Sequence, residues 1–425
     1  MKFFFPDSLD LVDPSFDFET ETRSASRVRQ RDDVYAHEVF ARPPYDGLLV
    51  SKAIVDGTAV SNGRYTLPQR HRLLREGVRR FFRLDERVEL QHIETIGDCG
   101  AFSYVNEDRP SYSVDDVLQF YETCGFTYGV SVDHVILGYD ATIDNPLLLS
   151  EAIPADWVRR QELTLELAHD FLRLHRSTGC HFVPVGVAQG WSPASYKRAI
   201  ISLQQMGYSK IALGGMVALK TQDILACLER VDEARRPGTA LHLLGVTRTE
   251  SVSRFADYGV ESFDSTSPLR QAFKDEKDNY YTPTRTYSAI RVPQVEGNPK
   301  LQARIAAGEI NQDQALRLER ECLRSLIEYD RGRAGLETVL YALGAYSELH
   351  GIGPQQLERE REVLEDQPWK TCACEICRDI GIHVVLFRGA ERNRRRGFHN
   401  VYVFFFQRLR ERIAETVLTT DAASD

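Results

Sequence analysis

The chain has 425 residues, 42% of them hydrophobic and 27% charged, which is the composition of a globular protein with material for a large core. Its net charge of −9 argues against a protein that coats nucleic acid non-specifically, although a local basic groove stays compatible with it. The apolar run at the N-terminus is too short for a signal-peptide core, and no stretch approaches the roughly 20 apolar residues of a membrane span. We expect a soluble, cytoplasmic protein without a disulfide framework.

Short apolar runs that end in glycine or a polar residue alternate with helix-like segments between residues 45 and 270. The runs are 47–55, 88–100, 128–136, 181–190, 210–216, 240–247 and 259–266, and the helix-like segments include 195–206 and 221–234. Strands that alternate with helices predict βαβ units and a parallel sheet. Six or seven such units favour an α/β fold of the (β/α)₈ TIM-barrel type over an open, doubly wound sheet. These runs leave the eighth strand unplaced.

Polar side chains or glycines follow several of these runs. They are Asp98, Asp133, Gln189, Gly214, Gly215 and Asp264. In a parallel barrel the catalytic residues lie just past the carboxyl ends of the strands, so we expect these residues to face one mouth of the barrel. Any one of the aspartates can instead be a helix N-cap, whose oxygen accepts from free backbone N–H groups. Caps alone explain the whole set less well.

Three of the eight cysteines lie within six residues. Cys372, Cys374 and Cys377 form a C-x-C-x₂-C motif, and His383 and His399 follow it. Zinc prefers four such ligands in a tetrahedron, and Cys₃His is a common structural set. We predict a structural Zn²⁺ site, because a closed four-ligand site leaves no position for a reactive water. The alternatives are three free cysteines in a loop and an iron–sulfur cluster, which the lack of a fourth cysteine nearby disfavours.

The later part of the chain differs in character from the barrel-like part. Residues 299–350 are predicted to be mostly helical, and the cysteine motif and the basic run 392–399 follow them. We predict two domains. Residues 1–295 would form the barrel with an N-terminal extension, and residues 296–425 would form a helical, zinc-binding subdomain packed on the barrel.

Together these motifs resemble the tRNA-guanine transglycosylases, (β/α)₈-barrel enzymes with a C-terminal zinc site. The resemblance covers roughly residues 45–400. It is carried by "GDCGAF" (97–102), "SVDHV" (131–135), "GVAQG" (186–190), "LGGM" (213–216), "FDSTSPLR" (263–270), and the C-x-C-x₂-C motif followed by "HN" (399–400). Each block is weak alone, but the set in this order is specific for the family.

Two departures from the family pattern concern the substrate. Cys99 and Ala101 replace a serine and a glycine of the first block, and residues 271–287 replace a basic, glycine-containing stretch that helps the family hold tRNA. The N-terminal sequence instead resembles a branch that acts on DNA and replaces guanine by 7-cyano-7-deazaguanine (preQ0). The alternatives are exchange in tRNA and a non-catalytic, zinc-bearing subunit that binds nucleic acid or a partner. A zinc hydrolase would need an open metal site.

The resemblance implies a pentosyltransferase and a role for each residue. Asp264 would be the nucleophile toward C1′, and Asp98 the general acid/base. Asp133 and Gln189 would recognise the base. Gly214 and Gly215 would allow close approach to the Met216 amide, and Phe102 would stack on the base or pack in the core. His399, rather than His383, would complete the zinc site.

The resemblance also implies partners. DNA is the expected substrate, with tRNA as the alternative, and a companion protein with nuclease- or ATPase-like features is expected. Arg270, Arg394, Arg395 and Arg396 are the predicted nucleic-acid contacts. Charge runs are often only solvated surfaces, so this last prediction depends on where the fold places these side chains.

Overall fold

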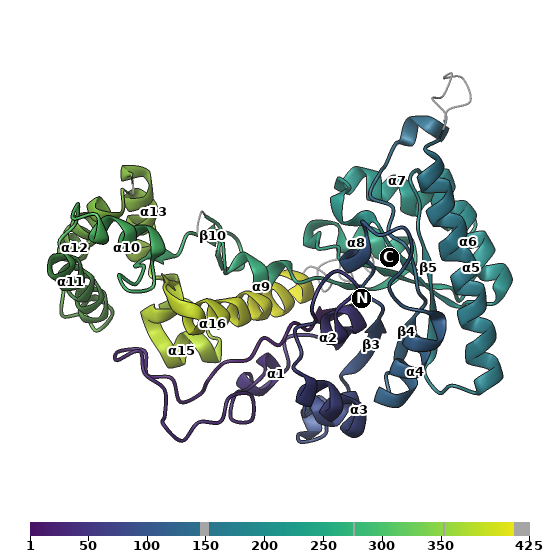
Figure 1. Cartoon of the computed structure of the whole chain (residues 1–425). Coiled ribbons are helices and arrows are strands. Elements are labelled where there is room, and N and C mark those ends of the chain that lie inside the picture. Colours follow the sequence, from purple (N-terminus) through teal and green to yellow (C-terminus); the bar gives the residue numbers. More distant parts are fainter. Residues whose placement is uncertain (145–152, 275–276, 352, 412–425) are drawn as a thin grey trace, which may run out of the picture. The chain divides into compact units, whose positions relative to one another are not determined.

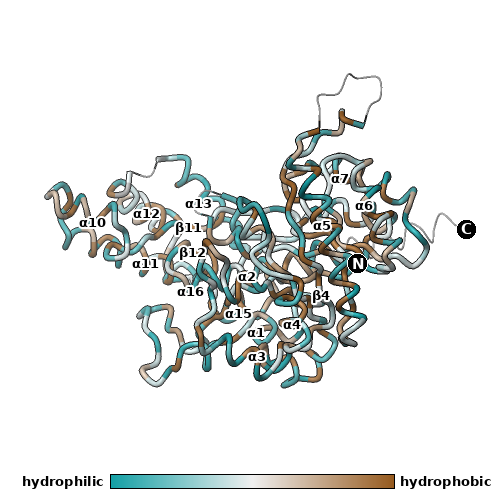
Figure 2. Tube along the Cα trace, turned by 45° about the vertical axis from the view of Figure 1, so that its right-hand side comes forward, coloured by the Kyte–Doolittle hydropathy of each residue, from teal (hydrophilic) through white to brown (hydrophobic). Residues whose placement is uncertain are grey.

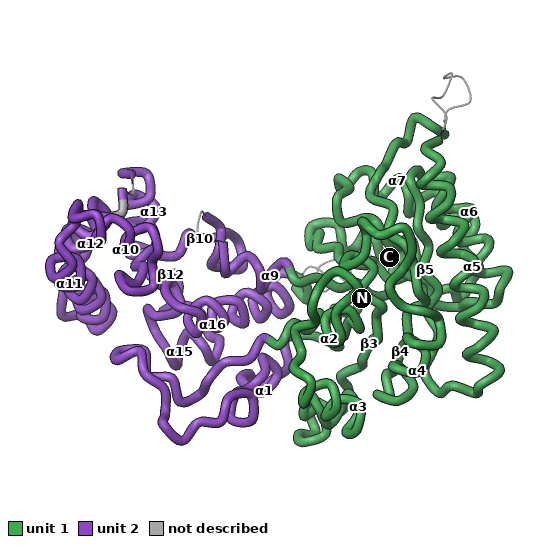
Figure 3. The backbone as a smooth tube through the Cα atoms, viewed as in Figure 1, with its two compact units in different colours: residues 1–9, 45–266, 409–425 green, residues 10–44, 267–408 purple. Residues whose placement is uncertain are grey.

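The computed structural model describes residues 1–144, 153–274, 277–351 and 353–411. They form two compact units (Figure 3). Unit 1 comprises residues 1–9, 45–266 and 409–411, and unit 2 comprises residues 10–44 and 267–408. The domain boundary expected near residue 295 stays a prediction. In the described chain, every helix is too short or too polar to cross a membrane.

Unit 1 is a closed barrel of eight parallel strands, in the order β1 to β8 (Figure 1), which confirms the predicted TIM barrel. The strands are β1 (Lys2–Pro6), β2 (Gly47–Ser51), β3 (Glu94–Asp98), β4 (Tyr128–Val130), β5 (Val183–Ala188), β6 (Lys210–Leu213), β7 (Ala240–Leu243) and β8 (Val260–Asp264). The strand that the sequence left unplaced is β1. It pairs with β2 on one side and β8 on the other, with Phe4 level with Gly47 and with Asp264.

The barrel interior is filled by apolar side chains from most of its strands. They are Phe4, Leu49, Ile96, Val130, Val185, Val187 and Ala212. Because helices cover the outside, the strands are buried on both faces and their sequences are nearly continuous apolar runs. Gly47 is required beside Phe4, since a Cβ there would lie 2.3 Å from the Phe4 ring.

The helices of unit 1 follow the strands and cover the barrel, as Figure 1 shows for α4 to α7. The Ser113 hydroxyl caps the start of α4 by accepting from the Asp116 N–H, and Gly125 ends that helix in the left-handed conformation. The helices are α2 (Lys52–Asp56), α3 (Leu67–Phe81), α4 (Val114–Cys124), α5 (Ala155–Thr178), α6 (Pro193–Met206), α7 (Thr221–Asp232) and α8 (Val252–Asp257). Short 3₁₀ helices cover Val88–Leu90, Ala101–Tyr104, Ala141–Asp144, Met216–Ala218 and Thr249–Ser251.

Unit 2 is mainly helical. Its helices are α1 (Ala36–Val39), α9 (Ser267–Gln271), α10 (Pro299–Ala306), α11 (Gln312–Asp330), α12 (Leu336–His350), α13 (Pro354–Asp366), α14 (Pro368–Thr371), α15 (Glu375–Ile380) and α16 (Gly389–Tyr402), with a 3₁₀ turn at Gly381–Val385 and a π-helical turn at Val403–Leu409. Strands β9 (Tyr280–Tyr281) and β10 (Thr286–Tyr287) form an antiparallel pair, and β11 (Ile290–Arg291) and β12 (Leu386–Phe387) form a parallel pair. Most residues along α13 and α16 are hydrophilic (Figure 2).

Truncating Phe4 should destabilise unit 1, because this buried ring fills the barrel where β1 closes it. We expect Phe4→Ala to lower the unfolding free energy by about 3–5 kcal/mol. Urea denaturation followed by circular dichroism would measure the change. Val60→Ala is the matched control. Val60 is 73% exposed, so this variant should lose little unfolding free energy. Equal stability of the two variants would show that β1 does not contribute to the barrel core.

Candidate functional site

Three aspartates lie at the carboxyl ends of barrel strands. Asp98 is the last residue of β3, Asp264 is the last residue of β8, and Asp133 follows β4. Since parallel strands end at the same mouth of a barrel, these carboxyl groups share one region of unit 1. The charges of Asp133 and Asp264 both act on Asp98, which places the three groups in one electrostatic cluster.

Asp98 is the most perturbed acid of this cluster. Burial, and then the negative charges of Asp133 and Asp264, raise its pKa to about 7, and a hydrogen bond from the Gly100 N–H partly opposes the rise. A carboxyl group with this pKa is present in both protonation states near neutral pH. It can therefore give a proton to one reacting group and take a proton from another.

Asp133 and Gln189 form a buried polar pair. The Gln189 Nε2 group donates to Asp133 Oδ2 at 2.6 Å, and Gln189 Oε1 accepts from the Ile136 N–H at 3.3 Å. Burial raises the pKa of Asp133 to about 6, although the hydrogen bonds from Gln189 and Cys99 oppose the rise. The pair presents a carboxylate and an amide side by side, which is the chemistry that can recognise the polar edge of a nucleobase.

Gly214 and Gly215, which follow β6, leave the space that the Gln189 amide occupies. A Cβ on Gly214 would lie 2.2 Å from Gln189 Nε2, so a larger residue would displace the amide. Gly215 has a φ of +75° and leads into Met216, which is fully buried. Phe102, in the 3₁₀ helix after β3, is 53% exposed and does not pack as a core residue.

Asp264 is held by two groups that the sequence reading missed, His242 in β7 and Gly245. The His242 Nε2 atom lies 3.1 Å from Asp264 Oδ1, and the Gly245 N–H donates to the same oxygen at 3.0 Å. A carboxylate only accepts, so Nε2 carries the proton, and Nδ1 faces the Ser262 hydroxyl at 2.8 Å. Among the described residues, both hydrogen bonds to Asp264 fall on Oδ1, and Oδ2 accepts neither of them.

A second pair that the sequence reading missed supports Asp133. The Cys99 thiol donates to Asp133 Oδ1 at 3.3 Å, and the Tyr104 hydroxyl contacts Cys99 Sγ at 3.1 Å and the Asp133 carbonyl oxygen at 3.2 Å. A buried tyrosine six residues beyond a strand is a common core feature, so the sequence offers no signal for this contact. Cys99 and Gln189 together engage both oxygens of Asp133 and fix its orientation.

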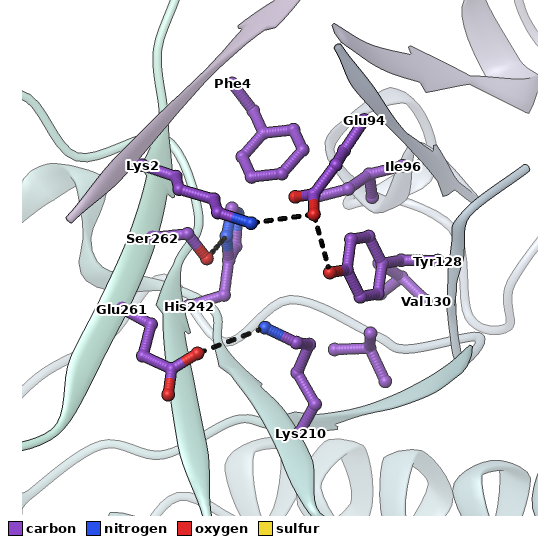
Figure 4. A pocket seen from close by; sticks show the side chains of 11 residues that line it. Lys2, Phe4, Glu94, Ile96, Tyr128, Val130, Lys210, His242, Glu261 and Ser262 are labelled. Carbon is purple, nitrogen blue, oxygen red and sulfur yellow. Dashed lines mark hydrogen bonds and ion pairs between the residues drawn. The ribbon is translucent and has the colours of Figure 1, made fainter. Parts of the chain in front are cut away.

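The opposite, amino-terminal end of the barrel contains a small cavity of about 70 Å³ (Figure 4). Its ionic groups pair with one another. The Lys2 ammonium lies 2.7 Å from Glu94, which also accepts from the Tyr128 hydroxyl, and Lys210 lies 3.6 Å from Glu261. Paired charges at this end of a TIM barrel are typical of stability rather than catalysis. The candidate site is therefore at the carboxyl ends of the strands.

Unit 2 contains a group that could hold a metal ion. The ligand atoms of Cys372, Cys374, Cys377 and His399 all lie within 4.8 Å of one another. His399 Nδ1 is 3.7, 3.4 and 3.3 Å from the three sulfurs, in that order. Zn–S and Zn–N bonds of about 2.3 and 2.0 Å in a tetrahedron require ligand separations of roughly 3.5 Å. The four residues fit a tetrahedral ion of this size.

The surroundings of His399 fix which ring nitrogen faces the sulfurs. Its Nε2 group donates to the Tyr281 carbonyl oxygen at 2.8 Å, so Nδ1 is free of a proton for a metal ion. The Tyr280 ring stacks on the imidazole at 4.2 Å, and its hydroxyl lies 3.3 Å from Cys377 Sγ. His383 lies outside this group, where its ring packs against Phe18 at 5.4 Å.

The four arginines predicted to contact nucleic acid differ in exposure. Arg270 is exposed on α9, and the Arg394 side chain is 31% exposed. Arg395 and Arg396 are buried, and they donate at 2.6 Å to the carbonyl oxygens of Asp13 and Ala272, respectively. Buried guanidinium groups that bind backbone oxygens stabilise unit 2 and are unavailable to a phosphate. Contact with nucleic acid stays a prediction for Arg270 and Arg394, and the burial argues against it for the other two.

The fold and these residues define a TIM-barrel protein with a carboxylate cluster at the carboxyl ends of its strands and a separate Cys₃His group. No family model matches the chain. It is 50% identical over 410 residues to a DNA-guanine transglycosylase of Salmonella montevideo, and the match covers 95% of this chain and 96% of the relative. The chain belongs to the DNA-guanine transglycosylase branch of the tRNA-guanine transglycosylase superfamily, which confirms the family predicted from the motifs.

The raised pKa of Asp98 predicts a pH-dependent stability. The folded chain binds this proton with a pKa of about 7 against an ordinary value of 3.8, so stability falls as the pH rises from about 4 through 7. Asp98→Asn removes this titration. Between pH 5 and pH 8 the wild-type protein should lose about 2–3 kcal/mol of unfolding free energy relative to the variant, measured in urea. If the difference in unfolding free energy between the wild-type protein and Asp98→Asn were the same at pH 5 and pH 8, the raised pKa of Asp98 would be contradicted.

Proposed function

We propose that this protein replaces guanine in DNA by 7-cyano-7-deazaguanine through a covalent sugar–enzyme intermediate. The observation that carries the proposal is the arrangement of two carboxyl groups at one barrel mouth. Asp264 is oriented by His242 and Gly245, and Asp98 has a pKa of about 7. The Asp264 carboxylate suits a nucleophile, and the Asp98 carboxyl group suits a proton carrier. The activity in the name of the Salmonella montevideo relative supports the same assignment.

The exchange runs as two displacements at C1′ of the deoxyribose. Asp264 Oδ2 attacks C1′, the N-glycosidic bond breaks, and Asp98 gives its proton to the departing ring nitrogen of guanine. The incoming base then loses its ring proton to Asp98, and its nitrogen attacks C1′ and displaces the Asp264 carboxylate. Two inversions give net retention, and Asp98 returns to its protonated state. The proton that leaves with guanine is replaced by the one that the new base brings.

Recognition of the base rests on the groups beside the carboxylates. The base must leave the duplex stack to reach the barrel mouth, where the exposed Phe102 ring can stack on it. Asp133 accepts from the N1–H and amino edge of the base, and Gln189 pairs with O6. The Met216 amide, which the glycine pair makes approachable, contacts the oxygen of guanine or the cyano group of the new base.

His242 is a positioning residue in this scheme. Its hydrogen bond to Oδ1 keeps the carboxylate in one orientation, and the Ser262 hydroxyl at Nδ1 keeps the imidazole in one tautomer. The histidine thereby presents Oδ2 to the sugar without taking part in the proton transfers. The companion protein implied by the family resemblance stays a prediction, and DNA rather than tRNA is the proposed substrate.

The Cys₃His group is proposed to bind a structural Zn²⁺ ion. The four side chains fill a tetrahedral set, so the ion would have no open position for water. Its role would be to join the turn before α15 to α16, which carries His399, inside unit 2.

Loss of the nucleophile should abolish exchange. Asp264→Asn should lower incorporation of labelled 7-cyano-7-deazaguanine into duplex DNA by about 10³-fold or more, because an amide cannot form the sugar ester. Asp257→Asn is the control, since Asp257 is exposed at the end of α8. The assay is run with the purified chain and with added extract of the source cells, which supplies a companion protein, and the covalent DNA adduct is sought on denaturing gels.

The assay also separates the alternatives. Incorporation of the labelled base into tRNA but not into DNA would show that the protein is a tRNA-guanine transglycosylase. A folded wild-type chain that binds DNA but exchanges no base under either condition would favour the non-catalytic subunit. Full activity of Asp264→Asn would overturn the assignment of the nucleophile.

Removal of the metal should destabilise the protein. Elemental analysis should give about one zinc per chain, and Cys374→Ser or a strong chelator should remove it and lower the melting temperature. Cys180→Ser is the control, because Cys180 lies outside the metal-binding group. An unchanged melting temperature after complete removal would contradict the structural role, and iron in place of zinc would contradict the identity of the ion.

A further inference from the structure

Unit 2 contains an open groove of about 1000 Å³ whose charged lining residues are all basic. We call it the basic groove. It lies among α10, α12 and α13, which are neighbours in Figure 1. Its basic residues are Lys277, Arg291, Lys300, Arg304 and Arg359, and its other lining residues are polar, glycine, proline or leucine. The concentration of positive charge contrasts with the net charge of −9 of the whole chain.

Three of these cations are available to a ligand. Lys277 and Lys300 are exposed, and Arg359 is half-buried. Within the described part of the chain, these three residues form no ion pair, whereas Arg304 pairs with Glu309 at 3.0 Å. The Nε atom of Arg359 is buried and has no hydrogen-bond partner among the described residues. This N–H group of the guanidinium is therefore not satisfied by the described residues of the unit.

One acid whose charge interacts with Arg291 and Arg359 is buried. Glu360 is fully buried, and it accepts from the Arg291 backbone N–H and from Gln356. Burial raises the pKa of Glu360 to about 7, so a substantial fraction of it is uncharged at neutral pH. It therefore offsets little of the positive charge that the groove presents.

A helix end adds to the positive potential. Helix α13 starts at the groove with Gly353 as N-cap and Pro354 in its first turn, and no side chain among the described residues caps its amides. Helix α10 also starts there, but the Asn298 side chain accepts from two of its first amides. The amino-terminal end of a 13-residue helix carries a partial positive charge and directs N–H groups at an anion.

We propose that the basic groove binds the phosphodiester backbone of the DNA substrate. The proposal rests on the proposed function for the choice of DNA, and on the lysines, arginines and helix end for the phosphate chemistry. A small-molecule site of this size is usually apolar and enclosed, whereas this groove is open and polar. Lysine and arginine side chains along an open groove suit a repeating anion that passes through it.

Salt-dependent DNA binding by the full chain tests this directly. The groove variant combines Lys277→Gln, Lys300→Gln and Arg359→Gln. The control combines Arg317→Gln, Arg320→Gln and Arg324→Gln, which removes the same charge from exposed positions on α11. Fluorescence anisotropy with duplex DNA at several salt concentrations gives the affinity and the slope of log K against log salt. The groove variant should bind at least about 10-fold more weakly, and its slope should fall by roughly 2–3, near 0.9 per lost phosphate contact.

The same experiment has outcomes that overturn the proposal. Equal weakening of both variants would show that only net charge matters. A wild-type chain without measurable DNA affinity, or a groove variant that loses affinity for tRNA or an acidic protein but not for DNA, would also refute it. Thermal unfolding and metal content establish that both variants are folded, and hydrogen exchange of the first turn of α13 should slow when DNA is added to the wild-type chain.

Failure of the groove is distinguishable from failure of the enzyme. If base exchange occurs and the groove variant binds DNA like the control, the groove proposal is wrong and the enzymatic proposal stands. If DNA binding depends on the groove but no base is exchanged, the enzymatic proposal is wrong and the groove remains a DNA-binding surface.

Discussion

The pairing of β1 with β8 is the contact on which the candidate site of unit 1 depends. It closes the ring of strands, and a closed parallel ring directs all eight carboxyl ends to one mouth. Phe4 of β1 lies level with Asp264, so the strand that completes the barrel also supports the residue proposed as nucleophile. Without this pair β8 would be an edge strand, with a row of unpaired backbone N–H and C=O groups beside Asp264.

The three aspartates at the carboxyl ends of the barrel strands have identical side chains but different surroundings. Asp264 receives two hydrogen bonds on one oxygen, from an imidazole and a backbone amide. Asp98 is half-buried near two other carboxyl groups, and desolvation together with their charges raises its pKa to about 7. Asp133 is occupied by a glutamine and a thiol. In the proposed mechanism, three residues of one type attack, carry a proton and recognise a base, because their surroundings differ.

Much of the fold and the metal-binding group can be predicted from the sequence. Buried parallel strands are continuous apolar runs, and cysteine spacing is a local property, so both leave a signal in the chain. Strand β1 was missed because its apolar run "FFF" is only three residues long and no helix pattern follows it closely. His242 was missed because a single histidine inside an apolar run gives no sign of which side chain it meets.

The exposure of charged residues was the least predictable feature. The sequence "RNRRRGFH" has the appearance of a solvated, cationic surface, yet Arg392, Arg395 and Arg396 are buried in unit 2. Their partners include backbone oxygens of Phe18, Asp13 and Ala272, far away in the sequence. The cations of the basic groove, in contrast, are scattered from residue 277 to residue 359, and only the fold brings them together.

The thiol of Cys99 has a consequence for the behaviour of the protein under oxidative stress. Peroxide attacks thiolates rather than thiols, so a cysteine is oxidised readily only where its thiol is deprotonated. Burial, followed by the charges of Asp133 and Asp98, raises the pKa of Cys99 well above its usual value, so the sulfur stays protonated. The same burial and negative charge that raise the pKa of Asp98 thus keep its sulfur neighbour protonated.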